Sequence, residues 1–500
     1  MKKPNKSAKA WTAETRRVER KDRLSELKGQ DGHHRSLAQK SPRRPLFIVV
    51  AVLLVLAVFI YAAFSLGLPQ RSLAIMSVDG QKIRVAQFNY WYGNILGQYG
   101  LTKNSAELQQ ILSTDAGGTT GTSVYDYLIA TTATQLQRIY TEAALAKEEG
   151  VTLGEYQRSV DSQIASLIKT AGSAGLADMM LKQTYGKGCT IGMVRSLYEA
   201  LYLSTKYAAV KAGAADVSAE ALAAYYTAHT GEIDKVDYRG FAFSFTVSAT
   251  ATAAENASAK AEAKKKADAF LAAVKTEEDF KTQALAATAE ADRAAYTTAD
   301  KSKLVGQTSA QLTTGVSTWM FDAARKAGDA SVIENTTDYS VVYFISRVKP
   351  VTPQSSVRHI LIGVDASATE AVKAAAKAKA DSLLAAVTTE QSFIDLVAAN
   401  SDDVASIAKG GLYTGMVAGA GYTAEFLAWS IDPVRKVGDK AVVETEYGYH
   451  LMYYSGTSPE WENTVRTALQ DQAYEDFVQA KLKEPRFAYT LDSFALRFVI

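Results

Sequence analysis

The sequence predicts a protein of the α+β class with one transmembrane helix, a helical domain and two α+β domains that repeat one another. Three observations lead to this prediction. Residues 46–68 are an uncharged apolar run, and residues 105–230 are mostly helical in pattern. Residues 236–349 then share their order of elements with residues 354–456. A chain of 500 residues is long enough for about three domains.

The first element is a membrane anchor that follows a basic tail, residues 1–45. Residues 1–44 hold 14 basic and 5 acidic side chains, against 41 and 48 in the rest of the chain. As a helix, the 23 residues 46–68 would reach about 35 Å and cross a hydrocarbon core of about 30 Å. Arg43 and Arg44 directly precede the run, so the positive-inside rule places the tail in the cytoplasm. We therefore interpret the tail as a topology signal attracted to anionic lipid, not as a nucleic-acid-binding arm.

An uncleaved signal anchor is favoured over a cleaved signal peptide, because the apolar run is longer than a signal peptide needs. Cleavage after Ala62-Ala63 remains the alternative. In both cases residues 69–500 are expected outside the cytoplasm, on a single-pass protein of the cell membrane. The one cysteine, Cys189, excludes an intrachain disulfide and lies too far from the anchor to carry a lipid there. We interpret it as a partly buried packing residue, with reactivity or intermolecular pairing as the alternative.

A helical domain is predicted over residues 69–235. Residues 76–85 read as two short strands around an Asp-Gly turn, and a helix with several aromatic side chains begins near Ala86. Gly150 closes a later helix, and Ser218 has the character of a helix N-cap.

The two repeats, residues 236–349 and 354–456, follow the helical domain. KADAFLAAVKTEEDF at 266–280 matches KADSLLAAVTTEQSF at 379–393 in ten of fifteen positions. WMFDAARKAGD and WSIDPVRKVGD match further on in the same order. Because both blocks occur in one order, they indicate two copies of one α+β domain. We call them the first repeat and the second repeat.

The last segment is residues 457–500. Ser458 to Lys483 is predicted to be an amphipathic helix. One face of it would carry Trp461, Val465, Leu469, Tyr474 and Phe477. The apolar residues after it are expected to pack on another domain, with the helical domain as the candidate.

Histidines are few enough to examine one by one. His33 and His34 lie in the tail, and His229 follows a helix and is expected at the surface. His359 and His450 lie in the first and last strands of the second repeat, so both imidazoles are expected to meet in one core. Two histidines invite a zinc site, but the spacing does not resemble a metalloprotease motif. A serine hydrolase and a phosphate-binding loop are disfavoured, because neither a nucleophile elbow nor a suitable glycine loop is present.

The motifs of the second repeat occur in a recognisable order. RHILI is followed by an Ala-rich helix ending in F-x-x-L-x-x-x-x-S, then by S-D-D, K-G-G, a Phe-containing helix and T-x-Y-G-Y-H. This order resembles the parvulin (PpiC-type) peptidyl-prolyl isomerase domain. The VDGQKI opening and the helical domain resemble the chaperone domain of the SurA and PrsA group, and the anchor is more like that of PpiD-type folding factors. The resemblance covers about residues 76–480.

The resemblance implies a catalytic set and a proline pocket. His359 and His450 take the paired core histidines, Asp403 takes the position near the substrate carbonyl, and Thr445 takes the hydroxyl position beside the histidines. The pocket positions fall on Leu412, Tyr413, Tyr422 and Phe426. Tyr422 stands where the family usually has Met or Leu, and either Leu412 or Tyr413 forms the adjacent wall. No cofactor or metal is implied.

The first repeat lacks these residues. Aligning the repeats sets Gly240 against His359 and Val342 against His450, and residues 230–358 contain no histidine. We therefore expect a degenerate parvulin-like domain in the first repeat, retained as a spacer or client-binding surface.

The sequence thus predicts a membrane-anchored, extracytoplasmic peptidyl-prolyl cis-trans isomerase and folding chaperone. Its partners would be unfolded or newly exported proline-containing polypeptides. The alternative is a holdase chaperone whose second repeat is catalytically weak or inactive. A third reading is a structural partner of the secretion channel, with the anchor as the contact.

Overall fold

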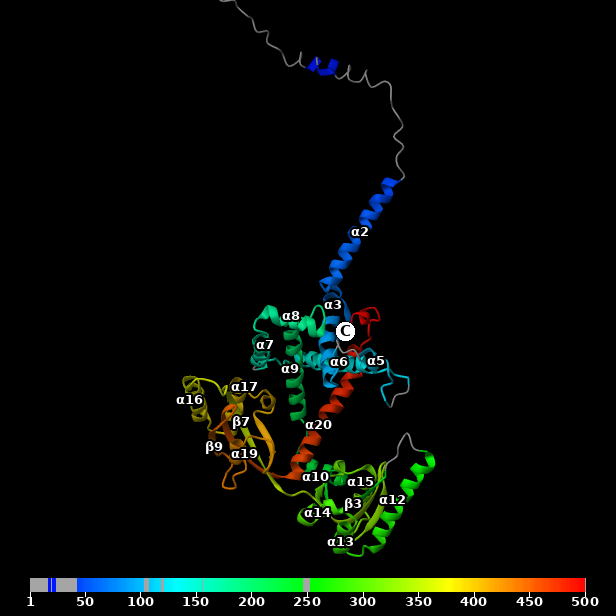
Figure 1. The fold of residues 1–500 in the computed structure, drawn as a ribbon. Coiled ribbons are helices and arrows are strands. Elements are labelled where there is room, and N and C mark those ends of the chain that lie inside the picture. The colour runs from blue at the N-terminus through cyan, green and yellow to red at the C-terminus, as the bar shows by residue number, and fades with distance from the viewer. Residues whose placement is uncertain are drawn as a thin grey trace, which may run out of the picture. The chain divides into compact units, whose positions relative to one another are not determined.

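The computed structural model describes residues 17–18, 20–23, 43–102, 108–117, 121–154, 156–245 and 252–499. Most of the predicted basic tail, with His33 and His34, lies outside the described residues. The chain divides into two units, Met1–Pro69 and Gln70–Ile500. Figure 1 shows the elements along the chain.

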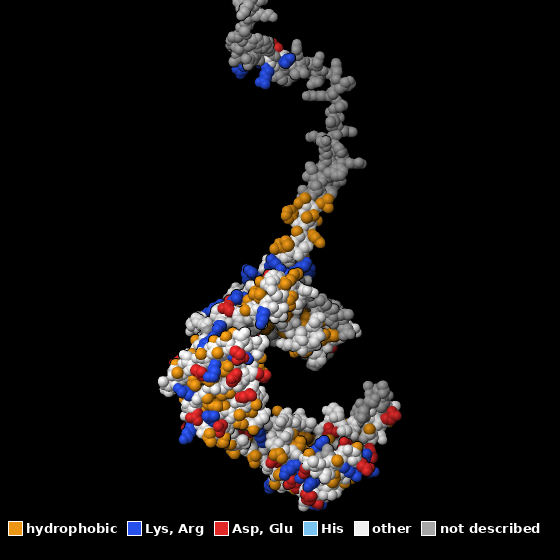
Figure 2. Space-filling model, turned by 60° about the vertical axis from the view of Figure 1, so that its left-hand side comes forward, with side chains coloured by type: hydrophobic (Ala, Val, Ile, Leu, Met, Phe, Trp, Pro, Cys, Tyr) orange, Lys and Arg blue, Asp and Glu red, His pale blue; other side chains and the backbone are white. Residues whose placement is uncertain are grey.

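The first unit contains helix α2, Arg43–Ser65, and α3, Leu68–Ser72, begins at its end. Large apolar side chains are exposed along α2, among them Val58 at 66% and Phe59 at 69%, and Figure 2 shows them gathered there. Among the residues that the structure describes, no helix meets the length and apolarity needed to cross a membrane. The predicted anchor is therefore not confirmed.

The helical region, residues 74–233, opens with the predicted hairpin. Strands β1 (Ala74–Val78) and β2 (Gln81–Arg84) pair around Asp79 and Gly80, whose positive φ angles of 50° and 74° suit a two-residue hairpin turn. The helices that follow are α4 (Val85–Gln98), α5 (Leu108–Leu112), α6 (Val124–Glu148), α7 (Tyr156–Ala171), α8 (Ala174–Tyr185), α9 (Ile191–Gly213), α10 (Ala219–Ala228) and α11 (Thr230–Ile233). Ser218 caps α10 as predicted, since its hydroxyl accepts the N–H of Ala221.

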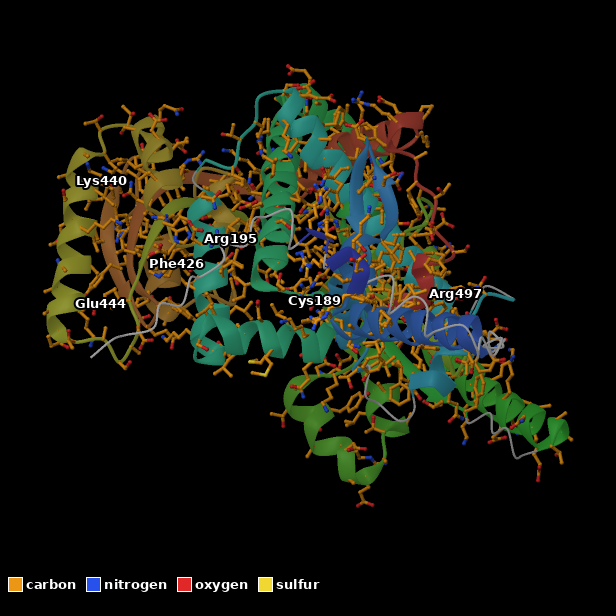
Figure 3. All side chains as sticks on the ribbon, turned by 90° about the horizontal axis from the view of Figure 1, so that it is seen from above. Cys189, Arg195, Phe426, Lys440, Glu444 and Arg497 are labelled. Atoms are coloured by element: carbon orange, nitrogen blue, oxygen red, sulfur yellow. The ribbon has the colours of Figure 1, made fainter. Side chains whose placement is uncertain are left out.

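Cys189 lies in the apolar core of this region, where it is fully buried and its Sγ contacts the carbonyl oxygen of Ala86 at 3.3 Å. Figure 3 shows it among the helices, apart from Phe426 of the second repeat. The geometry agrees with a packing role for this thiol.

The two repeats form antiparallel sheets with one strand order. In the first repeat the order is β4-β3-β6-β5, and in the second it is β8-β7-β10-β9. Elements of the first are β3 (Lys235–Ser244), α12 (Ala253–Ala273), α13 (Glu277–Ala287), η1 (Glu290–Asp292), α14 (Arg293–Ala299), β4 (Lys303–Gln307), η2 (Ser309–Gln311), α15 (Thr314–Met320), β5 (Ala330–Glu334) and β6 (Asp338–Val348). Elements of the second are β7 (Pro353–Gly363), α16 (Glu370–Ala386), α17 (Glu390–Asn400), α18 (Val404–Ile407), β8 (Leu412–Met416), α19 (Ala424–Ser430), β9 (Lys440–Thr445) and β10 (Gly448–Pro459). Each sheet thus places its first and last strands side by side in the middle.

The two faces of the second sheet pack against two different apolar cores. Ile360 and Leu451 face the core shared with α16 and α17, whereas Val357 and Met452 face the core shared with α19. Because strand side chains alternate between faces, His359 and His450 lie on the α19 side.

Helix α20 (Glu460–Leu482) begins directly after β10, and it is followed by η3 (Pro485–Phe487) and η4 (Ala495–Phe498). Phe487 and Ala495 are buried in the core of the helical region, as predicted for this tail. The five residues predicted for one face of α20 all contact the helical region. Trp461, Val465 and Leu469 pack near α10, Tyr474 contacts Glu142 of α6, and Phe477 contacts Tyr207 of α9.

Candidate active site

The paired strands β7 and β10 bring the two histidines together. In the register His359 lies opposite Met452 and His450 lies opposite Leu361. The two side chains therefore share a face, and their Nδ1 atoms lie 3.1 Å apart. The side chains are 4% and 6% exposed, so this contact is shielded from water.

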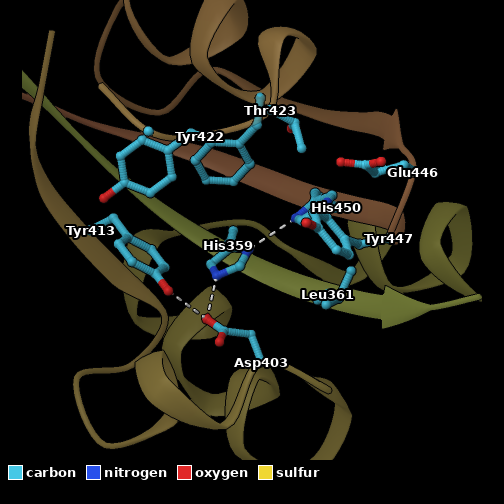
Figure 4. Close-up of a pocket in the computed structure, with 11 residues that line it drawn as sticks. His359, Leu361, Asp403, Tyr413, Tyr422, Thr423, Glu446, Tyr447 and His450 are labelled. Atoms are coloured by element: carbon cyan, nitrogen blue, oxygen red, sulfur yellow. Dashed lines mark hydrogen bonds and ion pairs between the residues drawn. The ribbon is translucent and has the colours of Figure 1, made fainter. Parts of the chain in front are cut away.

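Polar partners extend the pair at both ends, as Figure 4 shows in part. Thr445 Oγ1 lies 2.9 Å from His450 Nε2, and Asp403 Oδ2 lies 2.7 Å from His359 Nε2. Tyr413 donates its hydroxyl to the same Asp403 oxygen at 3.1 Å. The four residues predicted as catalytic thus form one hydrogen-bonded chain, and Tyr413 joins it at the Asp403 end.

When both imidazoles are neutral, the donor and the acceptor of each hydrogen bond in this series can be assigned. An Asp403 carboxylate only accepts, so His359 Nε2 carries a proton and His359 Nδ1 accepts. His450 Nδ1 then donates to His359, and His450 Nε2 accepts from the Thr445 hydroxyl. Every ring nitrogen has at least one partner, and His359 Nε2 also lies 3.3 Å from Ser406 Oγ, so the pair is a satisfied scaffold.

The surroundings shift two pKa values. Burial, followed by the charge of His359, lowers the pKa of His450 to about 4. Burial acts to raise the pKa of Asp403, but hydrogen bonds from His359, Ser406 and Tyr413 outweigh it and lower that pKa to about 2. Near neutral pH, His450 is therefore neutral and Asp403 is a carboxylate.

We expect the free energy of unfolding of the second repeat to fall as the pH is lowered from 6.5 to about 4. The unfolded chain takes up a proton at His450 near its ordinary pKa of 6.5, but the folded chain does so only near 4. Through His450, protons in this window favour the unfolded state by at most about 3 kcal/mol. The His450 contribution levels off below pH 4, where protonation of Asp403, whose pKa folding lowers from 3.8 to about 2, begins to add a further loss. Urea unfolding across this range should show the slope, and His450→Gln should flatten it; equal slopes in both proteins would contradict the assignment.

Backbone geometry positions Asp403. Helix α17 ends at Asn400, and Ser401 Oγ then accepts the N–H groups of Leu361 and Asp403, each at 3.2 Å. Asp402 accepts the N–H of Gly363 at 2.9 Å, which ties the same turn to β7.

A residue outside the repeat also holds this turn. Arg158 of α7 donates to the carbonyl oxygen of Ala399 at 3.0 Å and to that of Ser401. Tyr156, from the same helix, is fully buried in the core of the second repeat. The helical region therefore contributes to the support of the site.

A pocket of about 440 Å³ opens beside the histidine pair. Phe426 is 4% exposed and meets the edges of His359 and His450, with ring centroids 5.3 and 5.2 Å away. Tyr422 stacks on Phe426 at 5.6 Å. The pocket is lined by His359, Leu361, Asp403, Tyr413, Gly421, Tyr422, Thr423, Phe426, Glu446, Tyr447 and His450. It combines an aromatic slot with one polar wall.

Two predicted site residues lie elsewhere. Of the two alternatives for the adjacent wall, Tyr413 lines the pocket and Leu412 does not, because the two are neighbours on β8 and alternation points their side chains to opposite faces. Thr445 lies behind His450 and does not line the pocket. Glu446 and Tyr447 line the pocket but were not predicted as site residues, although both lie in the T-x-Y-G-Y-H motif.

The register of the first repeat corrects one alignment. Gly328 N–H binds Phe344 O as Gly438 N–H binds Tyr454 O, which makes Phe344 the counterpart of Tyr454. Counting back along β6 and β10 puts Ser340, not Val342, at the position of His450. The error is two residues, which keeps the same face and so leaves the apolar pattern unchanged.

The other half of the alignment agrees with the register, since Gly240 occupies the position of His359. A Cβ on Gly240 would lie 2.9 Å from the ring of Tyr238 and 3.3 Å from Leu304. These side chains leave no room for a side chain such as an imidazole at this position. At the other strand, Asn335 donates to Ser340 Oγ at 2.9 Å, in the place of the contact between Thr445 and His450.

Comparison with known proteins finds a matching domain family and similar solved structures. The PPIC-type PPIase domain family matches residues 339–455. No curated protein matches the chain. The solved structure of PrsA from Bacillus subtilis is 20% identical over 26% of this chain and 50% of its own, with a TM-score of 0.19. Peptidylprolyl isomerase (PrsA) from Bacillus anthracis is 23% identical over 27% and 61%, with a TM-score of 0.15. Foldase protein PrsA from Lactococcus lactis is 17% identical over 67% and 97%, with a TM-score of 0.19. This chain therefore spans half the length of the Bacillus subtilis protein.

Proposed function

We propose that the second repeat, which lies almost wholly within the match of residues 339–455 to the PPIC-type PPIase domain family, is a parvulin peptidyl-prolyl isomerase domain and catalyses cis-trans isomerisation of X-Pro bonds in unfolded proteins. The observation that carries the proposal is the buried chain Thr445–His450–His359–Asp403 beside an aromatic slot. A slot of this kind suits a proline ring, and the polar wall faces the bond before it.

The reaction needs no bond cleavage. Amide resonance gives a barrier of about 18–20 kcal/mol and concentrates negative charge on the carbonyl oxygen. The twisted transition state loses that resonance, so its oxygen is less negative. A carboxylate at Asp403, held near the carbonyl, destabilises the planar amide more than the twisted one. Lowering the barrier by about 4 kcal/mol would accelerate isomerisation roughly a thousandfold.

Each residue has a distinct part in this mechanism. Phe426, Tyr422 and Tyr413 receive the ring and exclude water from it. His359 fixes the Asp403 carboxylate, and His450 with Thr445 fixes His359. The imidazoles transfer no proton in this scheme, in line with the low pKa of His450.

The test is an isomerisation assay on the full chain with an X-Pro peptide. Asp403→Ala is expected to lower kcat/KM by about tenfold or more, because it removes the group that faces the reacting bond. Asp395→Ala is the matched control, since Asp395 lies on α17, is exposed and does not line the pocket. Near-background rates for all three proteins would favour the holdase, and client binding would then be the function to measure.

A chaperone role belongs to the same proposal. Helix α8 exposes Leu176, Met179 and Met180 at 46%, 58% and 43%. Adaptable apolar side chains of this kind suit contacts with varied unfolded segments. The first repeat would be a degenerate copy that keeps the strand order and serves as a spacer or client surface.

Membrane anchoring by residues 46–68 completes the proposal, with residues 1–45 in the cytoplasm and the rest of the chain extracytoplasmic. Its support is the uncharged apolar sequence and the two arginines before it. Protease added to intact cells should degrade the repeats and spare the tail; protected repeats would contradict this orientation. Contact with a secretion channel would be tested by crosslinking from the anchor, and products without any channel subunit would count against it.

A further inference from the structure

The charge in the pocket is one-sided. Asp403 and Glu446 line it, and among the residues that the structure describes no lysine or arginine does. Figure 4 shows the two carboxylates on different sides of the histidine pair. A peptide in the slot would therefore meet a second carboxylate in addition to the one that faces the reacting bond.

The two carboxylates are in different situations. Asp403 already accepts hydrogen bonds from His359 and Tyr413. Glu446 is exposed, and within the described part of the chain it has no hydrogen bond or ion pair. Its oxygens are thus available to a ligand in the pocket.

The turn that carries Glu446 is hydrogen-bonded to Thr445, the first residue of the series Thr445–His450–His359–Asp403. Glu446 and Tyr447 are the two residues between β9 and β10. Tyr447 donates its N–H to Thr445 Oγ1 at 3.2 Å, and the same oxygen contacts His450. This contact holds the turn in place at the rim of the pocket.

Tyr447 adds an aromatic surface beside the carboxylate. Its side chain is 59% exposed and lines the pocket with Glu446. A carboxylate next to an exposed aromatic ring suits a cation, because the carboxylate accepts charge-assisted hydrogen bonds and the ring face attracts positive charge. A guanidinium can use both.

We propose that Glu446 and Tyr447 bind the cationic side chain of an arginine or lysine next to the isomerised proline. This inference rests on the proposed function, because it takes the pocket as the proline site. The substrates favoured would be basic X-Pro or Pro-X segments, and acidic or phosphorylated neighbours would be disfavoured by the two carboxylates.

The test compares arginine with citrulline, which has a similar shape and no charge. Peptides with either residue before or after the proline are mixed with the full chain, and NMR titration and exchange spectroscopy measure binding and isomerisation separately. We expect the arginine peptide of at least one order to bind about two- to fivefold more tightly, the range of an exposed ion pair. Glu446→Gln should abolish the difference. Glu425→Gln should retain it, because Glu425 is exposed on α19 and does not line the pocket.

The outcomes separate the two proposals. Selective binding with exchange supports both, and selective binding without exchange supports the cation site while refuting the isomerase. Exchange with equal binding of arginine and citrulline in both orders overturns the cation site and leaves the isomerase. A preference that survives Glu446→Gln, or binding of neither peptide, also overturns it.

Discussion

Gly411→Ala is expected to abolish isomerase activity and to destabilise the second repeat by about 4 kcal/mol, near the upper end for a single substitution. Gly411 has a φ of +75°, which L side chains rarely adopt. An added Cβ would press directly on the carbonyl oxygen of His359 and lie 3.1 Å from Val397 Cγ2. Gly411 O also accepts the N–H of His359 at 2.9 Å. The substitution therefore displaces strand β7 at His359.

Gly419→Ala separates this clash from backbone strain. Gly419 has a similar φ of +82°, but a Cβ there would have no neighbour within 4 Å. Its replacement should cost only about 1 kcal/mol, the strain of the left-handed conformation. Urea unfolding and the peptide assay, run on both variants, measure the contrast. Similar losses in the two variants would contradict the close approach of Gly411 to His359.

Strand alternation and the order of the motifs were enough to predict part of the site. His359 and His450 could be expected to meet because the first and last strands of a small sheet are often neighbours, and β7 pairs with β10. Thr445 could be placed by its family position, and it contacts His450 at 2.9 Å. The meeting of the histidines needed only the order of residues along the chain, whereas the role of Thr445 needed the family resemblance.

Side-chain direction at turns and strand starts could not be predicted in the same way. Leu412 and Tyr413 are both candidates by sequence, and only the pairing of Tyr413 with Val357 fixes which one faces the pocket. Glu446 lies in a turn, where alternation gives no rule, so its direction depends on the contact of Tyr447 with Thr445. The alignment of the repeats set Val342 against His450, two residues away from the true counterpart Ser340. The apolar pattern could not reveal this error, because both alignments satisfy it.

Removal of residues 485–500 is expected to unfold the helical region at 25 °C. Phe487 is fully buried in its core, and loss of a buried phenylalanine costs about 3–5 kcal/mol. The segment also supplies the carbonyl oxygen of Phe498 to the amide of Asn89, whose side chain is fully buried. Loss of this one hydrogen bond adds about 0.5–1.5 kcal/mol. Backbone bonds from Asp79 to Arg486 and from Asp492 to Ile75 would be lost as well.

Together these losses approach the whole stability of a typical domain, about 5–15 kcal/mol. Hydrogen exchange at the amides of α4 and α6 measures the effect, and we expect protection there to disappear while that of β7 and β10 is reduced less. Phe487→Ala should reproduce part of the loss, whereas Phe494→Ala, at a side chain 54% exposed in the same segment, should change little. Retained protection of α4 and α6 in the shortened chain would mean that the helical region folds without its partner segment. If the expected loss is observed, residues separated by about 400 positions fold as one core, and the repeats between them are an insertion into the helical region.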